Sequence, residues 1–183
     1  MGVRVISGIA KGHTLQVPRG LIVRPTPERA REALFNILGD RVLDARFLDL
    51  YAGSGAIGVE ALSRGAREAV FVEKRPRVAA IVKRNLTKTR LAEHALVIVR
   101  DVSDALKWLI KARKTFDIVF GDPPYNSRTA PEILQFIGNK GLLDENGIVV
   151  WEHASGTGLP ANVGNLLSFK EVRYGDTSFS FLS

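Results

Sequence analysis

The chain has 183 residues, of which 45% are hydrophobic, and this length and composition are typical of one folded domain rather than of a disordered segment. It contains no cysteine, which excludes disulfides, thiolate metal ligands and thiol nucleophiles. It also has no apolar run of the roughly 20 residues that a membrane-spanning helix needs. The 26 Lys and Arg exceed the 19 Asp and Glu, and the resulting net charge of +7 favours a polyanionic partner such as nucleic acid. Because the N-terminus lacks a signal-peptide pattern, we expect a cytoplasmic protein.

The first 24 residues are predicted to form a basic β-hairpin extension. Residues 4–7 and 14–17 have the composition of short strands, and a glycine at position 12 suits the turn between them. Thr26 is then a suitable N-cap and Pro27 fits the first position of a helix that Gly39 ends. We therefore expect an extension over residues 1–24, followed by a domain over residues 25–183.

From residue 45 onward, short apolar stretches rich in Val, Ile and Phe alternate with helical stretches. This alternation predicts an α/β domain with a Rossmann-like, mostly parallel sheet that helices cover on both faces. The tail alternates polar and apolar residues around Gly175-Asp176 and predicts a C-terminal antiparallel hairpin. The predicted strands are 47–51, 69–73, 95–99, 116–121, 147–152, 168–174 and 177–182, and the predicted helices are 56–64, 77–89, 102–112 and 130–139.

A glycine-rich segment, Gly53-Ser54-Gly55-Ala56-Ile57-Gly58, joins the first of these strands to its helix. Glycines are needed where the backbone must turn tightly and let a ligand approach closely. The segment matches the dinucleotide-binding fingerprint, which is weak evidence by itself. It is not a phosphate-binding Walker A loop, because Val59 and Glu60 stand where Lys and Ser or Thr are required.

Carboxylates stand at the ends of three successive predicted strands. Asp49 would repel a pyrophosphate, but it suits the ammonium and sulfonium of S-adenosylmethionine. Glu73 can accept hydrogen bonds from both ribose hydroxyls of either ligand, and Asp101 could hold an adenine amino group. The alternative is that each carboxylate only caps the following helix. We favour an S-adenosylmethionine site, because a nicotinamide-dependent oxidoreductase would leave Asp49 without a role.

The second informative segment comprises Asp122, Pro123, Pro124 and Tyr125, directly after a predicted strand. The prolines stiffen the loop, so that the Asp122 carboxylate and the Pro123 carbonyl can both accept hydrogen bonds from one amino group. These bonds would localise the amine lone pair, and Asp122 would stabilise the positive charge that develops on nitrogen. Tyr125 offers an aromatic face for a base taken out of its stack. The alternative is a rigid turn. The prediction requires this stiff loop, which we call the Asp122 corner (residues 122–125), and the glycine-rich turn to face the same crevice.

The sequence resembles the RsmD-type methyltransferases along nearly its whole length. The resemblance is carried by the glycine loop, by Asp122–Tyr125 and by several N-terminal and C-terminal segments: residues 4–8, 11–12, 24–26, 29, 31–36, 72–74 and 174–177. It implies methylation of a guanine N2 amine in small-subunit (16S) ribosomal RNA, with the RNA held in a ribosomal assembly particle. The family's cofactor residues fall here on Asp49, Gly53, Gly55, Glu73 and Asp101, and its catalytic tetrad falls on residues 122–125.

The full set of candidate residues follows from these motifs and from the basic N-terminus. Lys83, Arg84, Lys88 and Arg90 are expected on a solvated helix face, Arg31 is expected to pair with Glu28 on another, and Trp108 and Trp151 are expected in the core. No group has metal-ligand spacing, and a monomer is expected. The cofactor candidates are Asp49, Tyr51, Gly53, Gly55, Glu73, Lys74, Asp101 and Val102, and the RNA-binding candidates are Arg4, Lys11, His13, Arg24, Thr26 and Arg29.

Several other functions fit part of the sequence. An adenine-N6 nucleic-acid methyltransferase would use the same tetrad, but it usually needs additional chain to recognise its target. A methyltransferase of protein glutamine typically has Asn in place of Asp122 and has no basic hairpin. A non-catalytic RNA-binding module would also explain the charge.

Overall fold

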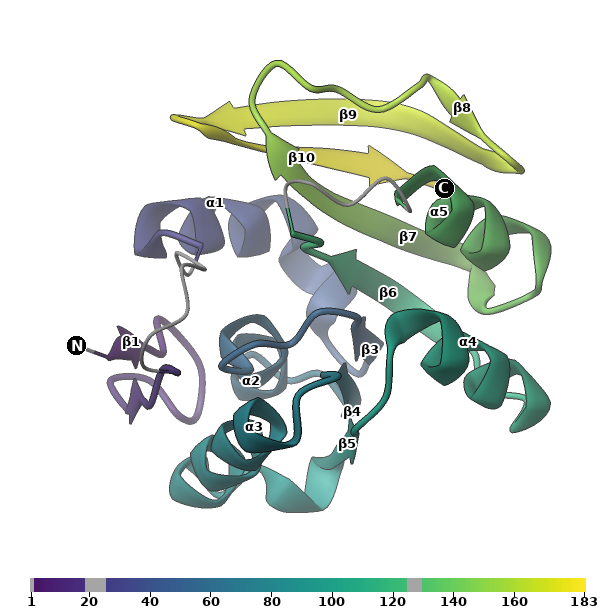
Figure 1. The fold of residues 1–183 in the computed structure, drawn as a ribbon. Coiled ribbons are helices and arrows are strands. Elements are labelled where there is room, and N and C mark those ends of the chain that lie inside the picture. The colour runs from purple at the N-terminus through teal and green to yellow at the C-terminus, as the bar shows by residue number, and fades with distance from the viewer. Residues whose placement is uncertain (1, 19–25, 125–129) are drawn as a thin grey trace.

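The computed structural model describes residues 2–18, 26–124 and 130–183. The predictions made for Arg24 and Tyr125 lie outside these ranges. The described chain forms a two-stranded N-terminal hairpin and an eight-stranded sheet flanked by helices (Figure 1). No described helix has the length and apolar character needed to cross a membrane. The described residues also contain no group of three or more His, Asp or Glu that could hold a metal ion.

The N-terminal hairpin pairs β1 (Val3–Arg4) with β2 (Thr14–Leu15) in an antiparallel arrangement. Both strands are shorter than predicted, because the chain between them curls into a loop closed by its own backbone. The Val5 amide donates to the His13 carbonyl at 2.9 Å, and the Gly12 amide donates to the Val5 carbonyl at 2.9 Å. The prediction of a hairpin is confirmed in outline.

The first helix, α1 (Glu28–Leu38), begins one residue later than predicted. Pro27 occupies the N-cap position, which has no side-chain cap, and the helix ends at Gly39 with φ of 52°. The prediction that Thr26 caps this helix is wrong, because its hydroxyl donates instead to Glu152 Oε2 at 2.8 Å. A short 3-10 helix, η1 (Gly39–Val42), follows.

The large sheet has the strand order β5-β4-β3-β6-β7-β10-β9-β8. The five strands from β5 to β7 run parallel, and β7, β10, β9 and β8 pair antiparallel. The predicted fold class is therefore confirmed, and only the two-residue strand β8 was not predicted. The strands are β3 (Arg46–Asp49), β4 (Glu68–Val72), β5 (Ala95–Ile98), β6 (Phe116–Gly121), β7 (Leu143–Ala154), β8 (Asn162–Val163), β9 (Leu166–Tyr174) and β10 (Thr177–Leu182).

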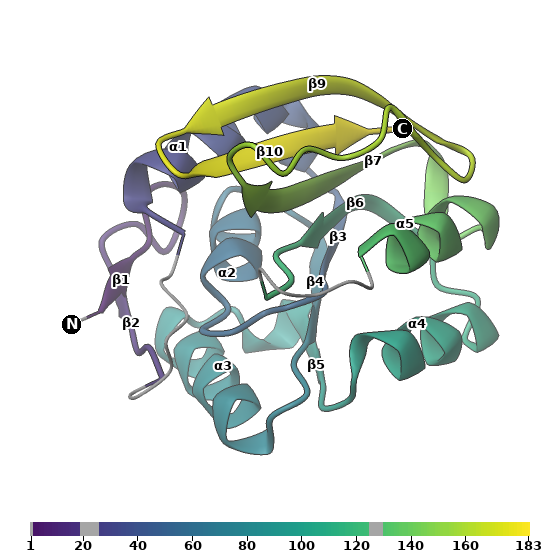
Figure 2. The same cartoon turned by 45° about the horizontal axis from the view of Figure 1, so that its top comes forward.

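Helices cover both faces of the parallel strands, as the apolar stretches predict (Figure 2). Successive strand residues point to opposite faces, so Phe47 packs in the core beneath α1, α2 and α3, while Leu48 packs in the core beneath α4 and α5. The helices are α2 (Ala56–Ser63), α3 (Pro76–Thr89), α4 (Val102–Lys111) and α5 (Ala130–Asn139), with a 3-10 helix η2 (Ala92–His94) after α3.

This topology fixes where a ligand can bind. The chain builds the sheet outward from β3 through β4 to β5, and then returns to place β6 on the other side of β3. Loops that leave the carboxyl ends of β3 and β6 therefore diverge and leave a crevice between them. Asp49 ends β3, and Asp122 directly follows β6.

The N-terminal hairpin is docked on α2 rather than extended into solvent. Glu60, which is fully buried, accepts hydrogen bonds from the amides of Ile6 and Ser7 at 2.8 and 3.0 Å. Ser63 accepts a bond from the Ala10 amide through its hydroxyl at 2.9 Å. A Cβ on Gly8, whose φ is 80°, would lie 1.7 Å from the Ser63 carbonyl oxygen, so only glycine allows this approach.

The two tryptophans differ from each other. Trp151 is 1% exposed in the core, as predicted. Trp108 is 36% exposed on α4, and the guanidinium of Arg100 lies 5.8 Å from its ring centroid, so its prediction as a core residue is wrong.

Candidate active site

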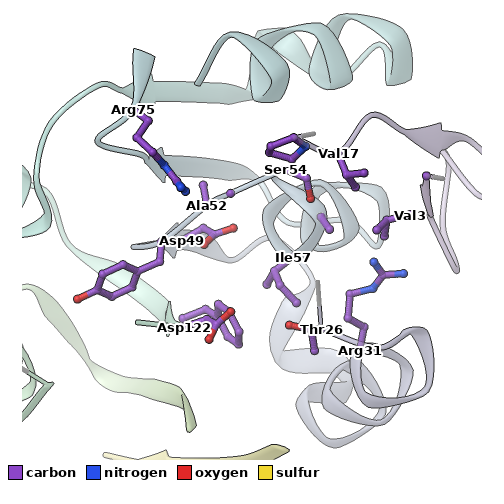
Figure 3. Close-up of a pocket in the computed structure, with 16 residues that line it drawn as sticks. Val3, Val17, Thr26, Arg31, Asp49, Ala52, Ser54, Ile57, Arg75 and Asp122 are labelled. Atoms are coloured by element: carbon purple, nitrogen blue, oxygen red, sulfur yellow. The ribbon is translucent and has the colours of Figure 1, made fainter. Parts of the chain in front are cut away.

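A cavity of about 370 Å³ lies at the crevice between β3 and β6. Its walls come from the end of β3, from the glycine loop, from the residue after β6 and from the N-terminal part of the chain (Figure 3). Asp122 and Gly53 both line it, so the structure brings the two sequence motifs to one site. Thr26 and Arg31 close the side of the cavity next to α1.

The glycine loop has the backbone that its composition predicts. Gly53 and Gly55 have φ of 54° and 79°, in the left-handed region that other residues avoid, and Gly55 is the N-cap of α2. Gly58 serves a different purpose, since a Cβ there would lie 2.3 Å from Phe71 Cε1. The third glycine therefore allows α2 to pack closely on β4.

Asp49 is 2% exposed at the end of β3 and points into the region of the cavity. Its Oδ2 accepts a hydrogen bond from the Gly58 amide at 3.3 Å. Burial raises the pKa of this carboxyl to about 7, and the amides of Gly58 and Tyr51 offset only part of that rise. A cation in the cavity would favour the ionised carboxylate. Asp49 is thus suited to a positively charged ligand.

Glu73 follows β4, is buried and does not itself line the cavity, but it contacts two residues that do, Gly53 and Arg75. Its Oε2 accepts from the Gly53 amide at 3.2 Å, and its Oε1 accepts from both the Arg75 amide and Arg75 Nε at 2.9 Å. The carboxylate therefore ties the glycine loop to the next turn. Arg75 lines the cavity and was not predicted, although its place two residues after Glu73 could have suggested it.

The remaining cofactor candidates divide into two groups. Tyr51 lines the cavity, and its ring stands edge-on to Trp151 with 6.1 Å between centroids. Asp101 is exposed and is the N-cap of α4, where its Oδ1 accepts from the Ser103 amide at 3.1 Å. Lys74 is exposed and Val102 is buried at the start of α4, and neither they nor Asp101 line this cavity.

The corner after β6 carries a carboxylate at the cavity wall. Burial raises the pKa of Asp122 to about 7. Pro123 is buried and Pro124 is exposed. Gly121 precedes this corner, and a Cβ there would lie 2.3 Å from Trp151 Cζ3, so the strand approaches β7 closely at this point.

Glu152 is a third acidic residue beside this corner, and the sequence interpretation missed it. It is 3% exposed on β7, one position beyond the pairing of Gly121 with Trp151. Burial, with the neighbouring charges of Asp122 and Asp49, raises its pKa to about 8, and the hydrogen bond from Thr26 opposes that rise. A glutamate at the end of a strongly apolar strand was the available signal.

The RNA-binding candidates do not form one group. Arg4, Lys11, His13 and Arg29 are exposed, whereas Thr26 is half-buried in the cavity wall. The outer face of α3, predicted to be solvated, also contacts the hairpin: Lys88 Nζ donates to the Thr14 carbonyl at 2.6 Å, and Arg84 Nε donates to Gln16 Oε1 at 3.2 Å.

The prediction for Arg31 is wrong. It was placed on a solvated helix face beside Glu28, but its side chain is 1% exposed and lines the cavity. One of its terminal nitrogens donates to the Arg4 carbonyl at 2.7 Å. The signal was its position three, four and seven residues before Leu34, Phe35 and Leu38, which places it on the apolar stripe of α1.

Two proteins with similar sequences are named as ribosomal RNA methyltransferases. The chain is 38% identical over 174 residues to "Putative rRNA methyltransferase YlbH" of Bacillus subtilis, with 95% of each chain covered. It is 34% identical over 177 residues to ribosomal RNA small subunit methyltransferase D of Escherichia coli, covering 97% of this chain and 87% of the relative.

Solved structures agree with this relationship. A hypothetical protein from Thermus thermophilus matches with a TM-score of 0.85 and 34% identity, with 98% of both chains covered. An RNA methyltransferase from Salinibacter ruber in complex with S-adenosyl-L-homocysteine has the same fold, with a TM-score of 0.62 and 17% identity over 86% of this chain and 92% of that one. The profile of the family described as "Conserved hypothetical protein 95" matches residues 3–183. The chain therefore belongs to this family, which is the family of RsmD-type methyltransferases that its sequence motifs resemble.

Proposed function

We propose that this protein transfers a methyl group from S-adenosylmethionine to the exocyclic N2 amine of a guanine in small-subunit ribosomal RNA. The observation that carries the proposal is the single cavity lined by both the glycine loop and Asp122. Two sequence-similar proteins are named as ribosomal RNA methyltransferases, which supports the substrate class. Guanine and its N2 atom come from the family resemblance.

The residues of the cavity fit S-adenosylmethionine. Asp49 is a buried carboxylate that a ligand ammonium or sulfonium would compensate, and the left-handed Gly53 and Gly55 leave the loop backbone open to close approach. Glu73 would hold the ribose hydroxyls from the end of β4. Asp101 lies outside this cavity, and it would hold the adenine amine of a cofactor that extends to the end of β5, in addition to capping α4. When bound, the cofactor supplies an electrophilic methyl group.

The Asp122 corner would prepare the amine. Its carboxylate and the carbonyl of Pro123 would accept hydrogen bonds from the two amine N–H groups, which localises the nitrogen lone pair and directs it into the cavity. Holding the amine next to the methyl donor would contribute a further proximity effect. Because the pKa of Asp122 is about 7, the carboxylate is also suited to accept a proton from the methylated nitrogen near neutral pH.

The exposed basic residues of the hairpin would bind the RNA backbone. Arg4, Lys11 and His13 lie on the hairpin and Arg29 lies on the first turn of α1, and we include Arg24 from the sequence. Replacing Arg4 and Lys11 with Glu should weaken RNA binding while the affinity for S-adenosylhomocysteine stays unchanged. Unchanged RNA binding would contradict this role.

The central experiment incubates free ribosomal RNA and small-subunit assembly particles with methyl-labelled S-adenosylmethionine, followed by nucleoside analysis. Label in N2-methylguanosine is the expected result. Asp122→Ala should abolish the label yet retain RNA binding, whereas Asp104→Ala, an exposed control on α4, should label normally. Label in a methylated adenine would contradict the guanine assignment, and label in protein would contradict the RNA substrate. RNA binding without any transfer would leave a non-catalytic binding module.

A further inference from the structure

Arg31 carries a buried positive charge for which the described residues provide no ion-pair partner. Its side chain is 1% exposed. One terminal nitrogen donates to the Arg4 carbonyl at 2.7 Å, while Nε is buried and has no hydrogen-bond partner among the described residues. Leaving a guanidinium in this state is costly unless another group completes its environment.

The nearby carboxylates do not fill this need. Glu60 raises the pKa of Arg31 by its charge, yet burial lowers that pKa by a larger amount. Both oxygens of Glu60 already accept other hydrogen bonds: Oε2 from the Ile6 amide, and Oε1 from the Ser7 amide and from Arg64 Nε at 2.7 Å. Glu28 lies on the exposed side of the first helical turn. A ligand with a negative charge would complete the site.

The cavity separates its charges. Asp49 and Asp122 stand on the wall formed by the ends of β3 and β6, whereas Arg31 stands on the wall formed by α1, beside Val3 and Thr26 (Figure 3). Arg75 also lines the cavity, but its guanidinium is already paired with the Glu73 carboxylate at 2.9 Å. A molecule that spans this space therefore meets carboxylates at one part and a guanidinium at another. This pattern complements a zwitterion, in particular an α-amino acid group with its ammonium and carboxylate.

We propose that Arg31 binds the carboxylate of the methionine portion of S-adenosylmethionine, while Asp49 receives its ammonium. The inference rests on the proposed function, because it takes S-adenosylmethionine as the ligand of this cavity. A phosphate of the RNA is the competing anion. The enclosed position of Arg31 favours the cofactor, since the exposed basic residues that suit RNA lie on the hairpin and on the first turn of α1.

The test measures binding calorimetrically rather than activity, with S-adenosylmethionine and with its decarboxylated form, which lacks only the carboxylate. The wild-type protein should bind S-adenosylmethionine about 10- to 100-fold more tightly than the decarboxylated compound, the range for one charge-assisted bidentate contact. Arg31→Met, which keeps much of the side-chain volume, should lose this preference by weakening only the carboxylated ligand. Arg67→Met, an exposed arginine that does not line the cavity, should keep the preference.

Several outcomes would overturn the assignment. Equal affinity of the wild-type protein for the two compounds would do so without any variant, which covers the case that Arg31→Met does not fold. Equal weakening of both compounds in Arg31→Met would show a structural role instead. Loss of RNA binding with unchanged cofactor binding would show a phosphate contact. Failure of the wild-type protein to bind either compound would instead contradict the proposed cofactor.

Discussion

Glu60 is expected to be the principal anchor of the N-terminal hairpin, and its removal should destabilise the protein strongly. The carboxylate is fully buried and accepts from the amides of Ile6 and Ser7, and it also pairs with Arg64 at 2.7 Å. Hydrogen bonds to a charged group each contribute about 1.5–3 kcal/mol. Glu60→Ala would remove two such bonds and leave both amides unsatisfied. Arg64 is partly exposed, so we discount the ion pair and expect a loss of about 3–5 kcal/mol.

Urea denaturation measures this loss, and hydrogen exchange locates it. The amides of Ile6 and Ser7 should lose protection in Glu60→Ala, whereas amides of the parallel strands should retain theirs. Glu60→Gln keeps one acceptor oxygen and should lose less stability, and Glu32→Ala on the exposed face of α1 serves as the control. A loss below about 1 kcal/mol, or unchanged exchange at Ile6 and Ser7, would refute the reasoning.

Three further predictions follow from the site. Gly58→Ala should lower the stability by about 1–3 kcal/mol, because the new Cβ would lie 2.3 Å from Phe71 Cε1. The displacement of α2 from β4 that relieves this clash should also impair cofactor binding at the glycine loop. Thermal unfolding without and with S-adenosylhomocysteine measures both effects. In the folded state the pKa of Asp122 is about 7 and that of Glu152 about 8, above the ordinary values of 3.8 and 4.5. The folded state therefore binds more protons than the unfolded state, and the unliganded protein should lose stability as the pH rises from about 4 through 8. Glu152→Gln should flatten this profile above pH 7, and stability that increases with pH there would contradict the assignment. Asp101→Ala should lower the stability by about 1 kcal/mol through loss of the α4 cap and should also raise the Kd for the cofactor. Asp101→Ser should restore the cap but not the cofactor affinity. An unchanged Kd in both variants would remove Asp101 from the cofactor site.

The sequence was sufficient to predict the parallel sheet and its helices. The boundaries of β6 and the end of α5 at Asn139 agree with the prediction, because the apolar stretch over 116–121 and the amphipathic stretch up to residue 139 are followed by residues that end regular structure. The glycine loop was equally readable, since positive φ at Gly53 and Gly55 is the conformation that glycine permits.

The residues that the sequence interpretation misplaced depend on long-range packing. The spacing of Arg31 places it on the apolar stripe of α1, but its contact with the Arg4 carbonyl in the hairpin joins segments 27 positions apart and is not indicated by the local sequence. Thr26 bonds to Glu152, which is 126 positions away, instead of capping its own helix. Trp108 is a large apolar residue of the kind usually found in a core, but it lies on the exposed face of α4. Periodicity identifies the apolar face of an element, and it does not identify which polar groups the fold brings to that face.

The last strand of the chain is an internal member of the sheet. β10 lies between β7 and β9, all six of its residues are buried, and the Ser183 amide still donates to the Leu167 carbonyl at 3.1 Å. The strands β7 and β9 are therefore joined through β10, and both ladders on this side of the sheet depend on it. Deleting residues 177–182 would remove this joining strand, so β9 and β8 should detach from the parallel part of the sheet.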